Sequence, residues 1–217
     1  MTHPEATVVD EYKGAKITIH FDGEKCIHSR NCVLGLPKVF QADAQGPWIK
    51  PDNASVEELI AVARSCPSGA ITYQRHDGGD AERAPDVNVI RVLENGPLAV
   101  TADLHIEGQE PRKRAALCRC GASKNKPFCD GTHEKAGFTA TGELPTEDSA
   151  PLEARNGKLE ITPFPNGPLG FAGNVEFIAG TGRTLNRLTK GALCRCGHSE
   201  NKPYCDGSHK AAGFTTE

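Results

Sequence analysis

Two stretches of the sequence place three cysteines and one histidine at identical spacing. CRCGASKNKPFCDGTH begins at residue 118 and CRCGHSENKPYCDGSH begins at residue 194, and both follow the pattern C-x-C-x8-C-x3-H. Thiolate and imidazole groups are common protein ligands of zinc and iron. The repeated pattern therefore predicts two metal centres, with these candidate ligands: Cys118, Cys120, Cys129, His133, Cys194, Cys196, Cys205 and His209.

The spacing within each motif bears on the kind of metal centre. Two thiolates separated by one residue can converge on one metal, whereas Cys129 and His133 reach a second one only if the chain turns sharply at Gly131. This arrangement suits a compact two-iron centre. A single zinc ion is the alternative, although common zinc fingers use C-x2-4-C pairs that this motif lacks. A disulfide framework would leave one cysteine of each set unpaired and the histidines without a role.

The two motifs resemble the CDGSH iron–sulfur, or mitoNEET-like, family. The resemblance rests on CRC, on a serine and a proline inside each motif, and on CDGTH or CDGSH at its end, where Thr132 keeps a hydroxyl group. It implies a 2Fe-2S cluster in each repeat. Cys118 and Cys120 would bind one iron and Cys129 and His133 the other, with Cys194, Cys196, Cys205 and His209 in the same roles.

The family resemblance also carries an expectation about architecture. Many members are homodimers that pair one motif per chain within a β-rich fold. Two copies in one chain therefore suggest an intramolecular, pseudo-symmetric pair of small β-rich units. The membrane anchor of some relatives has no counterpart in this sequence, so their role at an organelle surface is not expected here.

Three further cysteines, Cys26, Cys32 and Cys66, precede the repeats. Bacterial ferredoxins carry C-x2-C-x2-C followed later by C-P, but here Ser29 stands where the middle cysteine would fall. Residues 16–73 resemble a divergent single-cluster ferredoxin domain. That resemblance implies a cubane-type centre held by the three cysteines, either 3Fe-4S with an empty fourth corner or 4Fe-4S with His28 or another donor. A surface histidine is the alternative for His28.

Local patterns indicate the elements that would position these ligands. Residues 16–21 and 70–73 favour strands, and Ser55 with Glu58 forms a capping box that opens a helix through about Arg64. The tetrapeptides NGPL and AGFT each occur twice and mark an internal repeat, whose strand-like runs cover residues 87–93, 98–106, 159–162 and 175–178.

These patterns predict an α+β protein. The expected parts are a ferredoxin-like domain at residues 10–76, a linker at 77–86, a first CDGSH unit at 87–142, a linker at 143–156 and a second CDGSH unit at 157–217. Five cationic residues crowd the motifs and are interpreted as charges that steer an acidic partner, offset the charge of a cluster or solubilise the surface: Arg119, Lys124, Lys126, Arg195 and Lys202. Trp48 is interpreted as the apolar anchor of the first domain.

The composition limits the classes of partner and the cell compartment that are expected for this protein. The net charge is -3 and the charges are interspersed, which argues against nucleic acid as a partner. There is no apolar run of membrane-spanning length and no secretory pattern at the N-terminus, and nine cysteines are an odd number for a disulfide framework. A cytoplasmic protein without a membrane partner is expected.

The motifs favour a non-enzymatic electron carrier with three clusters and a redox partner protein. His133 and His209 could couple electron uptake to protonation. No dinucleotide fingerprint, phosphate loop or nucleophile-base pair is recognisable. The alternatives are a cluster donor that serves an apo-acceptor, a redox or iron sensor, and a zinc-stabilised interaction module.

Overall fold

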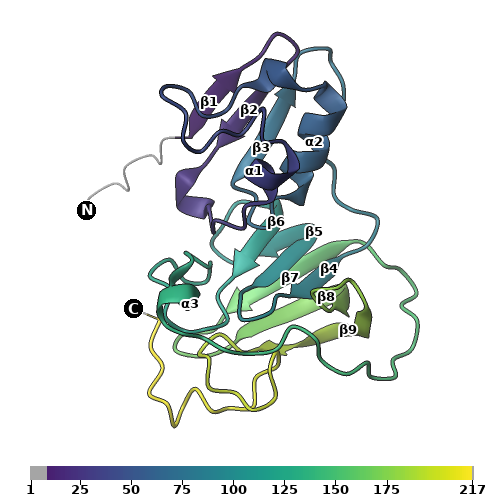
Figure 1. The fold of residues 1–217 in the computed structure, drawn as a ribbon. Coiled ribbons are helices and arrows are strands. Elements are labelled where there is room, and N and C mark those ends of the chain that lie inside the picture. The colour runs from purple at the N-terminus through teal and green to yellow at the C-terminus, as the bar shows by residue number, and fades with distance from the viewer. Residues whose placement is uncertain (1–8, 217) are drawn as a thin grey trace. The chain divides into compact units, whose positions relative to one another are not determined.

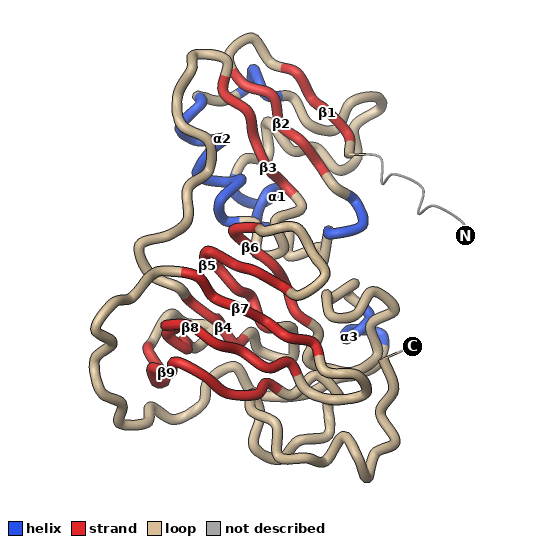
Figure 2. Tube along the Cα trace, turned by 180° about the vertical axis from the view of Figure 1, so that it is seen from behind, coloured by secondary structure: helices blue, strands red, loops and turns tan. Residues whose placement is uncertain are grey.

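The chain forms two compact units, with the boundary between Arg83 and Ala84. The structure is a computed structural model that describes residues 9–216. The second unit consists mainly of β-strands, whereas the first combines a small sheet with two α-helices (Figures 1 and 2). Among the described residues, every helix is too short or too polar to cross a membrane.

The first unit contains a small antiparallel sheet in the order β1-β2-β3. Its strands are β1 (Asp10–Lys13), β2 (Ile17–Phe21) and β3 (Ile71–Arg75). The helices α1 (Asn31–Gly35) and α2 (Val56–Ser65) lie over one face of this sheet in both views (Figures 1 and 2). Two short 3-10 helices, η1 (Gly23–Lys25) and η2 (Pro51–Asn53), lie in the connections.

The capping box predicted at the start of α2 is confirmed. The Glu58 N–H donates to Ser55 Oγ at 3.3 Å, and the Ser55 N–H donates to Glu58 Oε2 at 2.9 Å. These bonds satisfy donors that the first helical turn leaves free. Leu59 and Ala63, four residues apart on one helix face, are fully buried in the core of the unit. The predicted strands at residues 16–21 and 70–73 are present as β2 and β3.

The second unit builds one mixed sheet from both repeats. The first repeat supplies β4 (Val89–Val92), β5 (Leu98–Ile106) and β6 (Arg112–Leu117), and the second supplies β7 (Lys158–Pro163), β8 (Leu169–Ile178) and β9 (Thr184–Leu193). Neighbours run β4-β5-β7-β8-β9, with β6 also on β5 and β4 also on β8. The parallel pairs β5–β7 and β4–β8 each join one repeat to the other.

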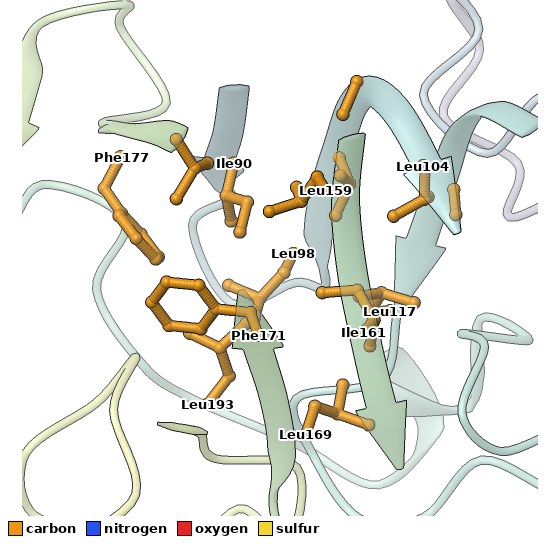
Figure 3. Packing of buried hydrophobic residues seen from close by; sticks show 14 of the residues in the cluster. Ile90, Leu98, Leu104, Leu117, Leu159, Ile161, Leu169, Phe171, Phe177 and Leu193 are labelled. Atoms are coloured by element: carbon orange, nitrogen blue, oxygen red, sulfur yellow. The ribbon is translucent and has the colours of Figure 1, made fainter. Parts of the chain in front are cut away.

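The core of the second unit lies between these interleaved strands. Figure 3 shows side chains from both repeats in contact, with Leu98 and Leu104 from β5 facing Leu159 and Ile161 from β7. All four are at most 1% exposed. Because apolar surface from both repeats is buried in one core, the repeats stabilise each other.

Candidate metal centres

Each cysteine motif begins where a strand ends. β6 and β9 stop directly before Cys118 and Cys194. The chain then returns beside the end of β6, since the Cys118 N–H donates to Pro127 O at 2.9 Å and the Cys129 N–H donates to Ala116 O at 2.8 Å. The second repeat makes the same two bonds at 2.8 and 2.9 Å. The third cysteine of each motif is thereby brought back to the first.

Short polar side chains hold the loop between the cysteines. The Ser123 hydroxyl donates to Phe128 O at 2.6 Å, and the Asp130 carboxylate accepts the N–H groups of Lys124 at 2.9 Å and Thr132 at 3.0 Å. The second repeat repeats all three bonds at 2.7, 2.8 and 3.0 Å. The Ser and Asp positions of the motif are therefore turn-forming, and they shape the loop that carries the candidate ligands.

The four predicted ligands of each motif lie as two close pairs. Cys118 Sγ lies 3.8 Å from Cys120 Sγ, and Cys129 Sγ lies 3.3 Å from His133 Nδ1. In the second repeat the corresponding distances are 3.6 and 3.4 Å. Within residues 9–216, no three His, Cys, Asp or Glu side chains gather as a site for one metal ion. The two atoms of each pair lie close enough together to bind one metal ion.

Backbone N–H groups point at the cysteine sulfurs. The Gly131 N–H donates to Cys129 Sγ and the Ala122 N–H donates to Cys120 Sγ, both at 3.4 Å. The second repeat has the same pair of bonds at the same distances. Such bonds favour the thiolate form, and hydrogen bonds to sulfur are one means by which a protein sets the potential of a cluster.

Burial opposes thiolate formation at several of the candidate ligands. The hydrogen bond with Cys120 and burial raise the pKa of Cys118, and burial raises the pKa of Cys129 to about 11. A buried thiolate therefore needs a nearby positive charge. A metal cation supplies it, so that metal binding at these sites releases protons.

The interpretation of Arg119 and Arg195 as solubilising or steering charges is wrong. Their exposed fractions are 1% and 3%, so neither side chain can solubilise the surface or steer a partner. Arg119 donates to the carbonyl oxygens of Leu93, Gly96, Ala140 and Thr141, and Arg195 donates to those of Phe164 and Gly167. Each guanidinium thus ties the Asn-Gly-Pro turn of its repeat to the motif. The recurrence of arginine between the two cysteines of both repeats could have indicated this role.

The two motifs contact each other through their backbones. Cys120 and Cys196 form an isolated antiparallel bridge. A Cβ atom on Gly121 would lie 2.5 Å from Cys196 O, and one on Gly197 would lie 2.6 Å from Cys120 O. Both glycines also have positive φ, at 82° and 85°. Glycine is therefore required at both positions for this close approach.

The three N-terminal cysteines line one cavity. The cavity has a volume of about 450 Å³ and is bounded by Cys26, Cys32 and Cys66 together with His28, Ser29 and apolar side chains. Burial raises the pKa of Cys26 and Cys32, and the charge of Cys66 raises both further. The structure thus gathers the three predicted ligands, and it places His28 at the same cavity with its side chain exposed.

Two polar contacts position these cysteines. The Asn31 side chain, at the start of α1, donates to Ser65 O at 2.8 Å, which joins the segment of Cys32 to the residue before Cys66. Between Cys26 and Cys32 the chain passes through positive φ at His28 (54°) and Arg30 (64°). Such a conformation is uncommon for residues other than glycine and curves the loop around the cavity.

Trp48 packs as an aromatic anchor of the first unit. Its ring centroid lies 6.3 Å from that of Tyr12, 4.9 Å from Phe21 and 6.0 Å from Phe40. Edge-to-face contacts of this kind stabilise small cores. The predicted role of Trp48 as an anchor is confirmed.

Comparison with known proteins identifies both parts of the chain. Residues 12–76 match the family described as divergent 4Fe-4S mono-cluster. Residues 95–134 and 166–210 both match the family described as iron-binding zinc finger, CDGSH type. Uncharacterized protein YjdI of Escherichia coli, in strains K12 and O157:H7, is 43% identical over 63 residues, which cover 29% of this chain and 82% of YjdI. The resemblances inferred from the cysteine motifs are confirmed.

Proposed function

Because the chain belongs to the divergent 4Fe-4S mono-cluster family in its first unit and to the CDGSH family in its second, we propose that it is a multi-cluster electron-transfer protein. The observation that carries the proposal is the pairing of donors in both CDGSH motifs, at Sγ–Sγ distances of 3.8 and 3.6 Å and Sγ–Nδ1 distances of 3.3 and 3.4 Å. When bound, the clusters supply one-electron redox chemistry.

The two CDGSH sites are proposed to hold 2Fe-2S clusters. Cys118 and Cys120 would bind one iron, and Cys129 and His133 the other, as would Cys194 with Cys196 and Cys205 with His209. His133 directs Nδ1 toward Cys129 Sγ, so Nε2 is the ring nitrogen that remains free to exchange a proton. Proton exchange at this atom would couple reduction to pH.

The N-terminal cavity is proposed to hold a 4Fe-4S cluster on Cys26, Cys32, Cys66 and His28. The position of His28 on the cavity wall supports it as the fourth donor. The description of the matching family as 4Fe-4S also supports this form over 3Fe-4S. A ferredoxin-like fold for residues 10–76 remains part of the proposal.

The two CDGSH motifs are proposed to form an intramolecular, pseudo-symmetric pair. The matched hydrogen bonds in both loops and the bridge between Cys120 and Cys196 support this arrangement. The proposed extents are residues 87–142 and 157–217, with linkers at 77–86 and 143–156. The partner would be a redox protein. All nine cysteines are proposed as cluster ligands and none as half of a disulfide, which supports a reducing compartment such as the cytoplasm.

A second candidate function is transfer of a cluster to an apo-acceptor. It is favoured by one difference between the repeats: Cys205 is partly exposed, whereas Cys129 is 4% exposed. A cluster in the second repeat would be easier for an acceptor to reach. Specific loss of that cluster to an apo-ferredoxin would support transfer, and reversible redox cycling without loss would support the carrier.

Electron paramagnetic resonance of anaerobically purified protein tests the proposal. We expect a sample that is silent as isolated and that shows 2Fe-type and 4Fe-type signals after reduction with dithionite. A 3Fe-type signal before reduction would remove His28 from the ligand set and leave the rest of the proposal intact. A reduced sample without 2Fe-type signals would contradict the assignment of both CDGSH sites.

Substitution of the histidines tests proton coupling. His133→Cys and His209→Cys replace a neutral donor by an anionic one, so each should lower the reduction potential of its own site and weaken its dependence on pH. Redox titration at several pH values measures both effects. Potentials that stay unchanged in both variants would show that these histidines are not ligands.

A further inference from the structure

The contact between the two CDGSH sites lies in a dry part of the second unit. Cys118 and Cys194 are each 1% exposed, and Cys196 is 5% exposed. Water and salt screen charges poorly across such a region. A change in charge at one site is therefore felt at the other.

The backbone contact between the sites is close and specific. The Cys120–Cys196 bridge joins one candidate ligand of each site directly. Gly121 and Gly197 leave no room for a Cβ atom against the opposite cysteine carbonyl. The two motifs therefore cannot separate without breaking this contact.

A cationic side chain of the first repeat contacts the second repeat. Lys126 Nζ lies 5.9 Å from the ring centroid of Phe214, and Arg195 Cζ lies 5.8 Å from the same ring. Phe214 therefore joins the motif loop of the first repeat to the motif arginine of the second.

We propose that the two CDGSH sites form one electrostatically coupled two-electron unit, in which the bridge between Cys120 and Cys196 holds the sites together. This inference rests on the proposed 2Fe-2S clusters. A one-electron donor gives up one electron to the first site, and the added negative charge disfavours entry of the second electron. The singly reduced unit exchanges its electron between the sites, and the second step takes another electron from the donor.

Stepwise reduction of the cluster-loaded full chain tests the coupling. Electron paramagnetic resonance spectra are recorded during titration with dithionite, at a temperature where cubane signals are broadened beyond detection. Two separated reduction steps are expected, together with splitting or broadening of the 2Fe-type signals in the fully reduced protein. Sharp, additive signals with independent midpoints would overturn the inference. Absence of 2Fe clusters would instead overturn the proposed function.

Gly121→Ala tests the bridge. Its added Cβ would meet Cys196 O at 2.5 Å and push the motifs apart. Gly137→Ala is the matched control, because Gly137 also has positive φ, at 62°, but has no atom within 4 Å of an added Cβ. Splitting of the signals should decrease only in Gly121→Ala. Equal splitting in the two variants would contradict the role of the bridge, and if Gly121→Ala does not fold, stepwise reduction of the unmodified chain still decides whether the sites are coupled.

Discussion

The two CDGSH repeats share their ligand loops and differ in how those loops are anchored. The bonds from Ser123 and to Asp130 recur at Ser199 and Asp206 with nearly the same lengths. Within the part of the chain that the structure describes, Arg119 donates to four carbonyl oxygens and Arg195 to two. The comparison indicates that hydrogen bonds within each motif determine the geometry of its candidate ligands. Hydrogen bonds from the motif arginine to the surrounding chain determine how strongly the motif is fixed in place.

The largest expected effect comes from removal of one ligand in either repeat. Cys129→Ser or Cys205→Ser should each lower the iron content by about two atoms per chain, because a serine oxygen is a poor substitute for an iron-bound thiolate. Iron and sulfide analysis measures the loss. The other repeat should keep its 2Fe-type signal, since its own loop bonds are intact. Loss of iron from both repeats in either variant would contradict the conclusion that each motif loop is held by its own hydrogen bonds.

Removal of Arg119 and removal of Arg195 should lower the stability of the second unit by different amounts. Arg119→Ala leaves four carbonyl groups without their donor, one in a buried and three in part-buried hydrogen bonds, and we expect the free energy of unfolding of the second unit to fall by at least about 3 kcal/mol. Arg195→Ala removes two such bonds and should cost about half as much. Denaturant unfolding of the apo-protein measures both values. Equal losses would contradict the difference in anchoring.

Low pH should destabilise the second unit by protonating Glu176, a buried carboxylate of the second repeat. Glu176 has a 5% exposed side chain bonded to Arg155 Nε at 2.7 Å, and this bond holds the pKa of Glu176 below its ordinary value. Its contribution is present above about pH 4.5 and is lost as the pH falls through the folded-state pKa. Glu176→Gln should remove about 1–2 kcal/mol at neutral pH.

The pH dependence of unfolding below pH 5 measures this contribution, and it should be flatter in Glu176→Gln. Asp103→Asn in the first repeat is the control, because the Asp103 side chain is 34% exposed and its bond to Lys113 is screened by water. An equal change in both variants would show that burial of Glu176 does not matter.

The smallest expected effect concerns the one extra histidine in the second motif. His198 occupies the position that Ala122 has in the first repeat, and both residues contribute only a backbone N–H to a cysteine sulfur. His198→Ala should therefore leave iron content and both potentials unchanged. A lowered iron content in this variant would make His198 a ligand and would break the equivalence of the two motifs.

Local signals in the sequence predicted the elements that carry their own pattern. The strand-like run at residues 98–106 predicted β5, and the pairing of Ser55 with Glu58 predicted α2. β6 was not predicted, because its sequence RKRAAL begins with cationic residues. These residues are half-buried or buried against other segments of the chain, which the local sequence does not show. The parallel pairing of β4 with β8 was not predictable either, since it joins segments from different repeats that are far apart in sequence.

The candidate sites were predicted more completely than the fold. The spacing of cysteine and histidine predicted eight candidate donors, and the structure brings them together in pairs, because metal ligation requires particular side chains at fixed offsets. The arginines were misinterpreted because burial of a charge depends on distant carbonyl groups, such as those of Leu93 and Ala140 around Arg119. No local pattern shows where such acceptors will lie.

Metal and sulfide analysis of protein purified without oxygen tests the central claim most directly. The account predicts about seven or eight iron atoms per chain, a similar amount of acid-labile sulfide, and no zinc. Colourless protein with stoichiometric zinc and no sulfide, which also fails to take up iron and sulfide on reconstitution, would contradict it.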